Sequence, residues 1–208
     1  MSPQAPCLLF GKGSLAIHAA ETLLRGGRNL VGVIPPASEP DWTASLKQWA
    51  ETNGTQVFES CDAALAANPH VGLGVSVFHD RIFTAQQIAR FQCLVNLHNG
   101  PLPRYRGVRP INWALKNQER SHGVTLHDVT PGIDAGDIIA QTLFGIDSDV
   151  DEVEDVYARC LSAGQRLLDL CLPGIEGLPR YPQDDALANY FSEADTPLLA
   201  DRLDWRRP

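Results

Sequence analysis

The sequence predicts an α/β protein built on a three-layer, mostly parallel twisted sheet of Rossmann-like type with helices on both faces. It opens with an apolar segment, an amphipathic segment and a second apolar segment, which is the pattern of a βαβ unit. Short apolar segments continue to alternate with helical ones as far as residue 98. Strands joined in this way run parallel, with right-handed crossovers. The chain has 208 residues, 44% of them apolar, so it can bury one sizeable core.

The first βαβ unit is predicted as a strand over 7–10, a helix over about 15–25 and a strand over 29–34. The turn between the first strand and the helix has the sequence GKGS and carries Lys12 and Gly13. One interpretation is a tight strand-to-helix turn. The other is a cradle for a phosphate at the helix N-terminus. The spacing matches neither a P-loop nor the GxGxxG motif.

The middle of the chain continues the alternation of helices and strands. The predicted elements are a helix with Asp41 or Thr43 as its N-cap that ends at about residue 52, a short strand over 57–58, a helix at about 63–67, a strand over 71–78 and a helix over 85–90.

A buried strand that begins at Cys93 delivers two polar side chains to its C-terminal end. Because side chains alternate along a strand, Asn96 and His98 point to the same face and Leu97 to the other. Asn offers amide donors, and His can act as an acid or a base near neutral pH. In an open parallel sheet, ligands bind beyond the carboxyl ends of the strands. The alternative is a turn-forming Asn and a core His, and an Asn-x-His pattern by itself does not decide.

The second half is predicted to hold a helix over 110–117 and two paired strands over 122–129 and 138–146. An acidic segment over 147–154 starts a long amphipathic helix that ends at about residue 172. We expect residues 1–176 to form one domain and residues 177–208 to form a tail that packs back on it.

The loop between the two paired strands carries Asp134 among small residues. Together, Asn96, His98 and Asp134 make a plausible acyl-transfer site with an oxyanion donor, an acid/base and an orienting carboxylate. On the preceding strand, His127 shares a face with Thr125. It is either a residue of the strand surface or part of the pocket for the acceptor.

Composition excludes several classes of protein. The formal net charge of −8 disfavours binding to nucleic acid. No apolar run reaches the roughly 18–20 residues that a membrane span needs, and the start of the chain lacks the features of a signal peptide. The five cysteines are scattered and show no CxxC spacing, so we expect a cytoplasmic protein with reduced thiols and no metal site.

Five short motifs lie close together in the sequence: NLH at 96–98, PLPRYRG at 101–107, PINWA at 110–114, GVTLH at 123–127 and GIDAGD at 132–137. They resemble the folate-dependent formyltransferase family, which includes glycinamide ribonucleotide formyltransferase, methionyl-tRNA formyltransferase and the sugar N-formyltransferases. One departure is a Gly-Pro-Leu-Pro sequence at 100–103, where the family often has Ser-Leu-Leu-Pro. The resemblance implies the formyltransferase fold.

The resemblance further implies transfer of a formyl group from N10-formyltetrahydrofolate to a primary amine, with Asn96, His98 and Asp134 as catalytic residues. Phe78 is a candidate for contact with the pterin, although simple core packing is the alternative. Arg106 either contacts a substrate anion or orders its loop. The implied folate contacts are Phe78, Pro101, Leu102, Pro103, Gly132 and Ile133, and the substrate contacts are Lys12, Gly13, Arg106 and His127.

The motifs over 102–117 and 123–130 look most like those of nucleotide-sugar N-formyltransferases. We therefore expect a nucleotide-linked amino sugar as acceptor, used in the synthesis of cell-surface polysaccharide such as lipopolysaccharide. The transfer-RNA enzyme continues into a further C-terminal domain, and this chain is acidic, so tRNA is not expected. The alternatives are an amino-acid-type acceptor (hydroxyornithine or an aminoacyl carrier protein), a formyltetrahydrofolate hydrolase and a non-catalytic folate-binding module. The protein could act as a homodimer.

Overall fold

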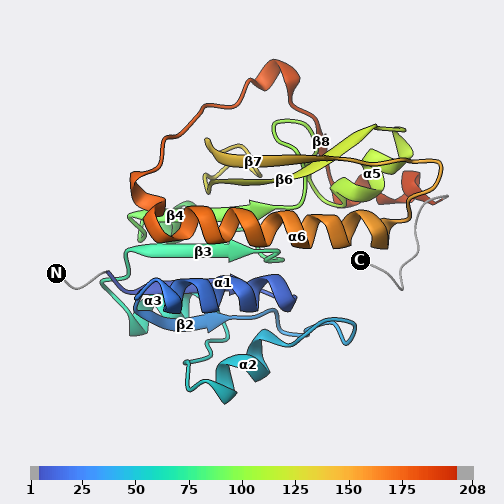
Figure 1. The fold of residues 1–208 in the computed structure, drawn as a ribbon. Coiled ribbons are helices and arrows are strands. Elements are labelled where there is room, and N and C mark those ends of the chain that lie inside the picture. Colours follow the sequence, from blue (N-terminus) through green and yellow to red (C-terminus); the bar gives the residue numbers. More distant parts are fainter. Residues whose placement is uncertain (1–4, 201–208) are drawn as a thin grey trace.

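The computed structural model describes residues 5–200 and shows one six-stranded sheet in the order β2-β1-β3-β4-β6-β7 (Figure 1). The first four strands in this order run parallel to one another, β6 is antiparallel to β4, and β7 is antiparallel to β6. The strands are β1 (Cys7–Gly11), β2 (Leu30–Ile34), β3 (Leu73–Val77), β4 (Cys93–His98), β6 (Ser121–Asp128) and β7 (Ile138–Gly145).

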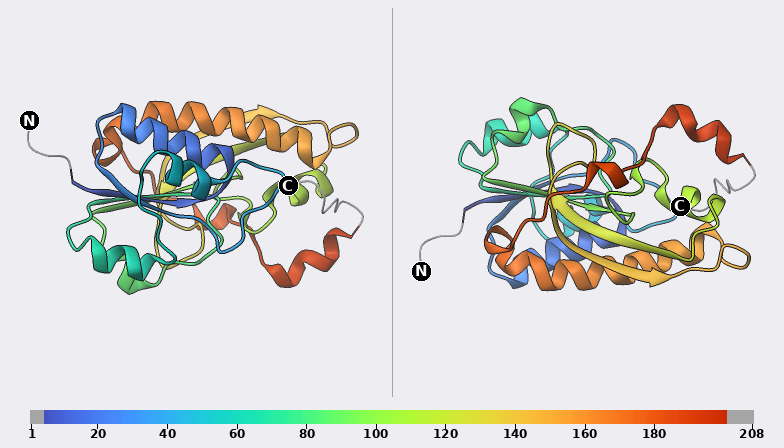
Figure 2. Two further views of the ribbon diagram at one scale, coloured as in Figure 1. Left: turned by 90° about the horizontal axis from the view of Figure 1, so that it is seen from below. Right: turned by 90° about the horizontal axis from the view of Figure 1, so that it is seen from above.

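Helices cover both faces of the sheet, which confirms the predicted three-layer fold. On one face lie α1 (Gly13–Arg25) and α6 (Val153–Cys171), side by side in Figure 2. On the other lie α3 (Cys61–Ala67) and the single turn α4 (Ala85–Ile88). The remaining helices are α2 (Leu46–Thr52), which contacts α1 and β2, and α5 (Pro110–Lys116), which contacts α6.

Strand β1 shows why the sheet is buried on both sides. All of its residues are buried, with Cys7 and Leu9 in the core beneath α1 and α6 and with Leu8 and Phe10 in the smaller core beneath α3. A continuous apolar run is typical of a parallel strand that is covered on both faces. Each large apolar side chain removed from water contributes about 1.5–3 kcal/mol, so this central strand anchors the two cores together.

Helix α2 begins later than its sequence predicts. Its N-cap is Ser45, whose Oγ accepts a hydrogen bond from the Gln48 amide at 3.0 Å, and neither Asp41 nor Thr43 caps it. The Glu39 carboxylate accepts a further hydrogen bond from the Leu46 amide at 2.7 Å. Two side-chain acceptors therefore satisfy the free amides of this helix start.

Two other predicted elements are also corrected. Residues 57–58 form no strand, because only one bridge joins Val57 to Val33. Helix α6 begins at Val153, after Glu152 as its N-cap, so most of the acidic segment precedes the helix as a turn. Within that turn, Asp151 pairs with Arg159 at 2.5 Å and accepts a hydrogen bond from the backbone of residue 147. The carboxylates of the segment thus order the approach to the helix.

The chain returns to the sheet after α6. A short strand β8 (Tyr190–Phe191) pairs in parallel with β5 (Arg106–Gly107), and a single bridge joins Tyr181 to Ile138. The other elements here are the 3₁₀ helices η1 (Leu172–Gly177), η2 (Asp185–Leu187) and η3 (Glu193–Leu199). The division at residue 176 stays a prediction, and residues 201–208 lie outside the described part of the chain. None of the helices between residues 5 and 200 is long and apolar enough to cross a membrane.

Candidate active site

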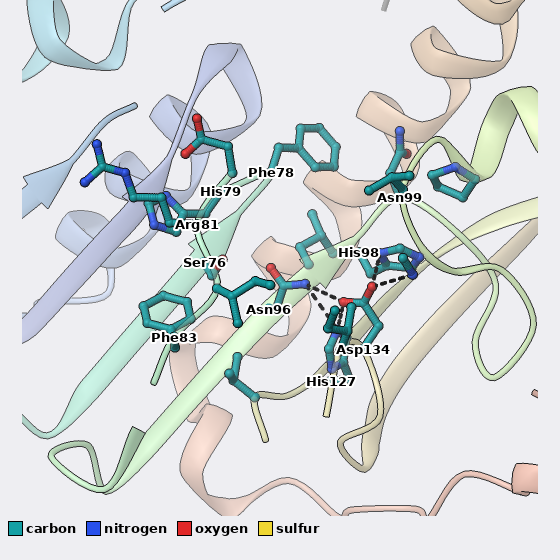
Figure 3. A pocket seen from close by; sticks show the side chains of 18 of the residues that line it. Ser76, Phe78, His79, Arg81, Phe83, Asn96, His98, Asn99, His127 and Asp134 are labelled. Carbon is teal, nitrogen blue, oxygen red and sulfur yellow. Dashed lines mark hydrogen bonds and ion pairs between the residues drawn. The ribbon is translucent and has the colours of Figure 1, made fainter. Parts of the chain in front are cut away.

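The predicted polar residues meet at the carboxyl end of β4. The antiparallel register places Asn96 opposite His127 and His98 opposite Thr125 on β6, and Asp134 follows in the loop between β6 and β7. Figure 3 shows the side chains of Asn96, His98, His127 and Asp134 pointing toward one another. Leu97 instead faces the core, as strand alternation requires.

The Asp134 carboxylate lies between three side chains and one backbone amide. Its Oδ2 is 3.4 Å from His98 Nδ1 and accepts a hydrogen bond from the Gly107 amide at 2.9 Å. Its Oδ1 is 3.5 Å from Asn96 Nδ2 and 3.5 Å from His127 Nε2. The side chain is only 14% exposed, so the charge is shielded from bulk water. The predicted set of Asn, His and Asp is therefore one contiguous cluster.

Both ring nitrogens of His98 face oxygen acceptors. Nε2 lies 2.8 Å from the Tyr105 carbonyl oxygen, and Nδ1 faces the Asp134 carboxylate. Only the imidazolium can donate to both. Burial lowers the pKa of His98, and the negative charge of Asp134 opposes that shift.

The charge on Asp134 follows from the same contacts. Burial alone would raise the pKa of Asp134, but His98, His127 and the Gly107 amide outweigh burial and hold that pKa below its ordinary value. Asp134 is therefore ionised at neutral pH and can take part in proton transfer with His98.

His127 belongs to this cluster, although its sequence position suggested a pocket for the acceptor. Its Nδ1 lies 2.8 Å from the Asp128 carbonyl oxygen, and its Nε2 lies 3.5 Å from Asp134 Oδ1. Asn96 Nδ2 lies 3.2 Å from this Nε2. The ring is almost fully buried and both nitrogens have protein partners, so His127 orients the Asn96 amide. Its contact with an acceptor stays a prediction.

A cavity with a volume of about 790 Å³ opens above the cluster, which is within the usual size range for small-molecule sites. The four clustered side chains form part of its wall. Four other residues that the sequence singled out also line it: Lys12, Phe78, Gly132 and Ile133.

Phe78 has a strained backbone at the end of β3. It follows β3 with a φ of 55°, in the left-handed region that non-glycine residues rarely adopt. Its ring lies 6.0 Å from that of Tyr157, so it packs partly on the core while it also lines the cavity. Both predicted roles of Phe78 are thus compatible with its position.

The predicted folate residues at 101–103 lie away from the cavity wall. Leu102 is buried, its amide donates to Thr125 Oγ1 at 3.1 Å, and its carbonyl accepts from Gln141 Nε2 at 2.8 Å. Pro101 and Pro103 flank it, and the wall described for the cavity includes none of the three. Leu102 is therefore tied to β6 through Thr125 and to β7 through Gln141. Folate contacts for residues 101–103 stay a prediction.

Arg106 is directed toward the C-terminal segment, whereas a substrate contact was one of its predicted roles. Its guanidinium donates to Gln183 Oε1 at 3.0 and 2.8 Å and to Asp185 at 2.8 Å. The side chain is 12% exposed. This geometry fits the alternative role, in which the arginine orders its loop.

Gly13 also has a packing role in the structure. It is buried at the start of α1, and a Cβ at this position would lie 2.9 Å from Thr43 Oγ1. Thr43 Oγ1 accepts a hydrogen bond from the Ser14 amide at 3.3 Å. The loop before α2 therefore covers part of the helix N-terminus, which favours the tight-turn interpretation for Gly13 and leaves Lys12 as the residue that reaches the cavity.

Several residues of the cavity wall were missed. Tyr190 and Glu193 reach it from the C-terminal segment, and no local pattern marks them because their position depends on the pairing of β8 with β5. His79 also lines the cavity, with its ring 5.5 Å from that of Phe10. Burial lowers the pKa of His79 to about 4, so its ring is neutral. The signal that could have identified His79 is its position in the sequence FHD at the end of a predicted strand.

Within residues 5–200, no group of three or more His, Cys, Asp or Glu side chains is arranged to hold a metal ion.

Comparison with protein families gives one match that covers most of the chain. The family model described as formyl transferase matches residues 34–172. These residues include the whole cluster of Asn96, His98, His127 and Asp134.

Solved structures are similar over nearly the whole chain. An N-formyltransferase from Helicobacter canadensis, in complex with folinic acid and dTDP-3-aminofucose, has a TM-score of 0.80 and 28% identity, covering 92% of this chain and 72% of that chain. WlaRD, a sugar 3N-formyl transferase in the presence of dTDP and 5-N-formyl-THF, has a TM-score of 0.80 and 25% identity, covering 94% of this chain and 72% of that chain. Phosphoribosylglycinamide formyltransferase from Bacillus halodurans shares the fold, with a TM-score of 0.70 and 21% identity over 83% of this chain and 95% of that chain.

Proposed function

Because this chain belongs to the formyl transferase family, we propose that it transfers a formyl group from N10-formyltetrahydrofolate to the primary amine of a nucleotide-linked amino sugar. The observation that carries the proposal is the contiguous cluster of Asn96, His98 and Asp134 on the wall of an open cavity. These are a donor, an acid and a base, which acyl transfer to an amine requires.

The comparisons support the choice of the two substrates. The Helicobacter canadensis structure holds folinic acid with an amino sugar linked to dTDP, and WlaRD was solved with dTDP and a formyl-folate. Both cover more than nine-tenths of this chain. Lys12 lines the same cavity as the cluster and supplies a positive charge for the phosphates of a nucleotide-linked acceptor. We place this reaction in the synthesis of cell-surface polysaccharide.

In the first step, the amine nitrogen attacks the formyl carbon and forms the new C–N bond. The electron pair of the carbonyl moves to the formyl oxygen, which becomes an oxyanion. Asn96 Nδ2 donates to that oxygen, exchanging its long contact of 3.5 Å with Asp134 for a hydrogen bond. Hydrogen bonds of this kind are often long before substrate binds and tighten in the transition state.

In the second step, the electron pair of the oxyanion re-forms the carbonyl, and the bond between the carbon and N10 of the folate breaks, with its electron pair leaving on N10. His98, as the imidazolium, gives its Nδ1 proton to N10 while Nε2 keeps its hydrogen bond to the Tyr105 carbonyl oxygen. Asp134 takes the amine proton directly or through a water molecule. The proton on Asp134 then returns to His98 across the 3.4 Å that separates Oδ2 from Nδ1. Holding the amine and the formyl carbon together in the cavity supplies much of the remaining rate enhancement.

The test measures release of tetrahydrofolate from N10-formyltetrahydrofolate, first without an acceptor and then with a panel of amines. The panel holds dTDP-, UDP- and GDP-linked amino sugars, hydroxyornithine and an aminoacyl carrier protein, with the Asp134→Asn enzyme as the inactive control. We expect turnover with one amino sugar only. Turnover with hydroxyornithine or the carrier protein would replace the acceptor class. Release without any acceptor would show a hydrolase and overturn the proposal.

A further inference from the structure

The C-terminal segment over 181–191 crosses both loops that meet at the Asp134 carboxylate. At one end, the backbone of Tyr181 exchanges hydrogen bonds with Ile138 at 2.8 and 2.9 Å, directly after the Asp134 loop. At the other end, β8 pairs with β5 and its Phe191 carbonyl accepts from the Val108 amide at 2.9 Å. Gln183 lies between these two attachments.

The side chain of Gln183 joins the two loops through four hydrogen bonds. Its Nε2 donates to the carbonyl oxygens of Asp134 at 2.8 Å and Gly136 at 2.7 Å. Its Oε1 accepts from Arg106 Nε at 3.0 Å and from Nη2 at 2.8 Å. A glutamine amide has two N–H donors and an oxygen with two lone pairs, so its full hydrogen-bonding capacity is used here.

The backbone that Gln183 holds is an unusual one. Asp134 has a φ of 49°, a left-handed conformation that costs energy for a residue with a side chain. Two residues later, a Cβ on Gly136 would lie 1.8 Å from the Asp128 carbonyl oxygen, so the loop passes close to the end of β6. The two hydrogen bonds from Gln183 hold the carbonyl groups of Asp134 and Gly136 in place. They thereby offset the backbone strain at Asp134.

The loop that contains β5 holds Asp134 by its side chain. Gly107 donates its amide to Asp134 Oδ2, and Gly107 sits in β5 next to Arg106, the second partner of Gln183. A Cβ on Gly107 would lie 2.0 Å from the Phe191 carbonyl oxygen, so the strand is tightly seated against β8. Gln183 therefore sets the distance between the backbone of Asp134 and the amide that its carboxylate accepts from.

We propose that Gln183 is a positioning residue for formyl transfer, which aims the Asp134 carboxylate at His98 and Asn96. The inference rests on the function proposed above, because it gives Asp134 a role in the reaction. Glutamine is the side chain that suits the site: glutamate has the same shape but would turn two donors into acceptors facing two carbonyl oxygens.

The first test compares Gln183→Ala and Gln183→Glu with the wild-type enzyme. We expect kcat to fall about 10- to 100-fold, because a misplacement of about 1 Å has this effect on a reacting group. KM for the acceptor should change by less than about threefold, since the interaction lost is one made in the transition state. The matched control is Asn189→Asp, which adds the same negative charge on an exposed side chain of the same segment and should keep wild-type kcat.

The second test asks whether Gln183 acts through Asp134. Gln183→Ala is combined with Asp134→Asn, and in that background the further loss of kcat should be less than about twofold, because coupled residues are not additive. Two measurements on the resting enzyme accompany the cycle. Hydrogen exchange of the Gly107 amide should become faster in Gln183→Ala. The NMR titration of His98 should move to lower pH, because Asp134 raises the pKa of His98 and would now lie farther away.

Each outcome decides one of the two proposals. Full activity of Asp134→Asn would overturn the proposed function itself. A slow Asp134→Asn enzyme together with wild-type kcat in Gln183→Ala would overturn the role of Gln183 alone. Equal losses from Gln183→Ala in both backgrounds would do the same, because they would show an effect that does not pass through Asp134.

Discussion

At the scale of single residues, the site is organised around the charge on Asp134. Its carboxylate contacts His98, His127, Asn96 and the Gly107 amide, and these contacts hold its pKa below the ordinary value despite burial. These contacts come from three strands, β4, β5 and β6. The carboxylate is therefore the point at which a single substitution should affect every step of the proposed reaction.

The first prediction concerns Asp134→Asn, which removes the charge and keeps the size of the side chain. The amide cannot take the amine proton or stabilise the His98 imidazolium, so kcat should fall by at least about 10²-fold. Steady-state release of tetrahydrofolate checks this result, and circular dichroism checks that the variant is folded. Near wild-type turnover in the folded variant would show that Asp134 has no part in the reaction.

The second prediction concerns the oxyanion donor. Asn96→Ala removes the amide that is oriented by His127 and should lower kcat about 10²- to 10³-fold, or roughly 3–4 kcal/mol in transition-state stabilisation. Asn96→Asp is the matched comparison, because it keeps the shape but places an acceptor where the oxyanion develops, and it should be at least as slow. An Asn96→Ala enzyme within about threefold of wild type would contradict the assigned role.

At the scale of elements, the ladder of β5 and β8 attaches the C-terminal segment to the site. Each strand has two residues, and so short a pair is not stable by itself. The stacking of aromatic rings supports it: Phe191 lies 4.3 Å from the Trp113 ring centre and 5.7 Å from that of Tyr105. Packing on α5 therefore keeps the ladder in place.

The third prediction follows from this packing. Phe191→Ala should lower the free energy of unfolding by about 1–3 kcal/mol, less than a fully buried Phe would, because the ring is half-buried. It should also lower kcat, since the strand that seats Gly107 is loosened. Urea unfolding and turnover are measured together. Leu187→Ala, on an exposed side chain of the same segment, is the control and should change stability by less than about 0.5 kcal/mol.

At the scale of the whole molecule, the buried core contains a histidine that stays neutral. His122 is fully buried between the Tyr105 and Phe144 rings, and its Nε2 donates to the Asn99 carbonyl oxygen at 3.0 Å. Burial lowers the pKa of His122 to about 4. The unfolded chain takes up this proton as pH falls below about 6.5, whereas the folded chain does so only near pH 4. The contribution to stability is therefore complete above pH 6.5 and is lost as pH falls.

The fourth prediction tests this linkage with His122→Gln, which keeps a donor for the Asn99 carbonyl and removes the titration. Between pH 7 and pH 4.5, the free energy of unfolding of the wild-type protein should fall by about 2–3 kcal/mol more than that of the variant. Urea unfolding at both pH values gives the comparison, and other titrating groups are common to both proteins. Parallel pH dependences would mean that His122 titrates alike in the folded and unfolded chains.

The cysteines are also part of the buried interior of the molecule. All five are free and buried. Burial raises the pKa of Cys7 to about 12 and that of Cys61 to about 11, so these thiols are poor nucleophiles. They act as small apolar side chains of the core.

Local sequence patterns predict structure that is determined by neighbours along the chain. Alternation along β4 placed Asn96 and His98 on one face, and the apolar runs located β1, β3 and β6. Helix starts were predicted less well: the acidic segment before α6 forms a turn, and the N-cap of α2 is Ser45. Several side chains there can cap a helix, and tertiary contacts of Glu39 and Arg159 select among them.

By itself, the sequence determined the α/β fold, the family and the presence of Asn96, His98 and Asp134 at strand ends and in a loop, because periodicity and motifs are local properties. Only the tertiary structure decided the partners of those residues. The link from Arg106 to Gln183 spans 77 positions and the contact of Asn96 with Asp134 spans 38. Hydrogen bonds across such separations depend on strand register and on the return path of the chain, which no local pattern encodes.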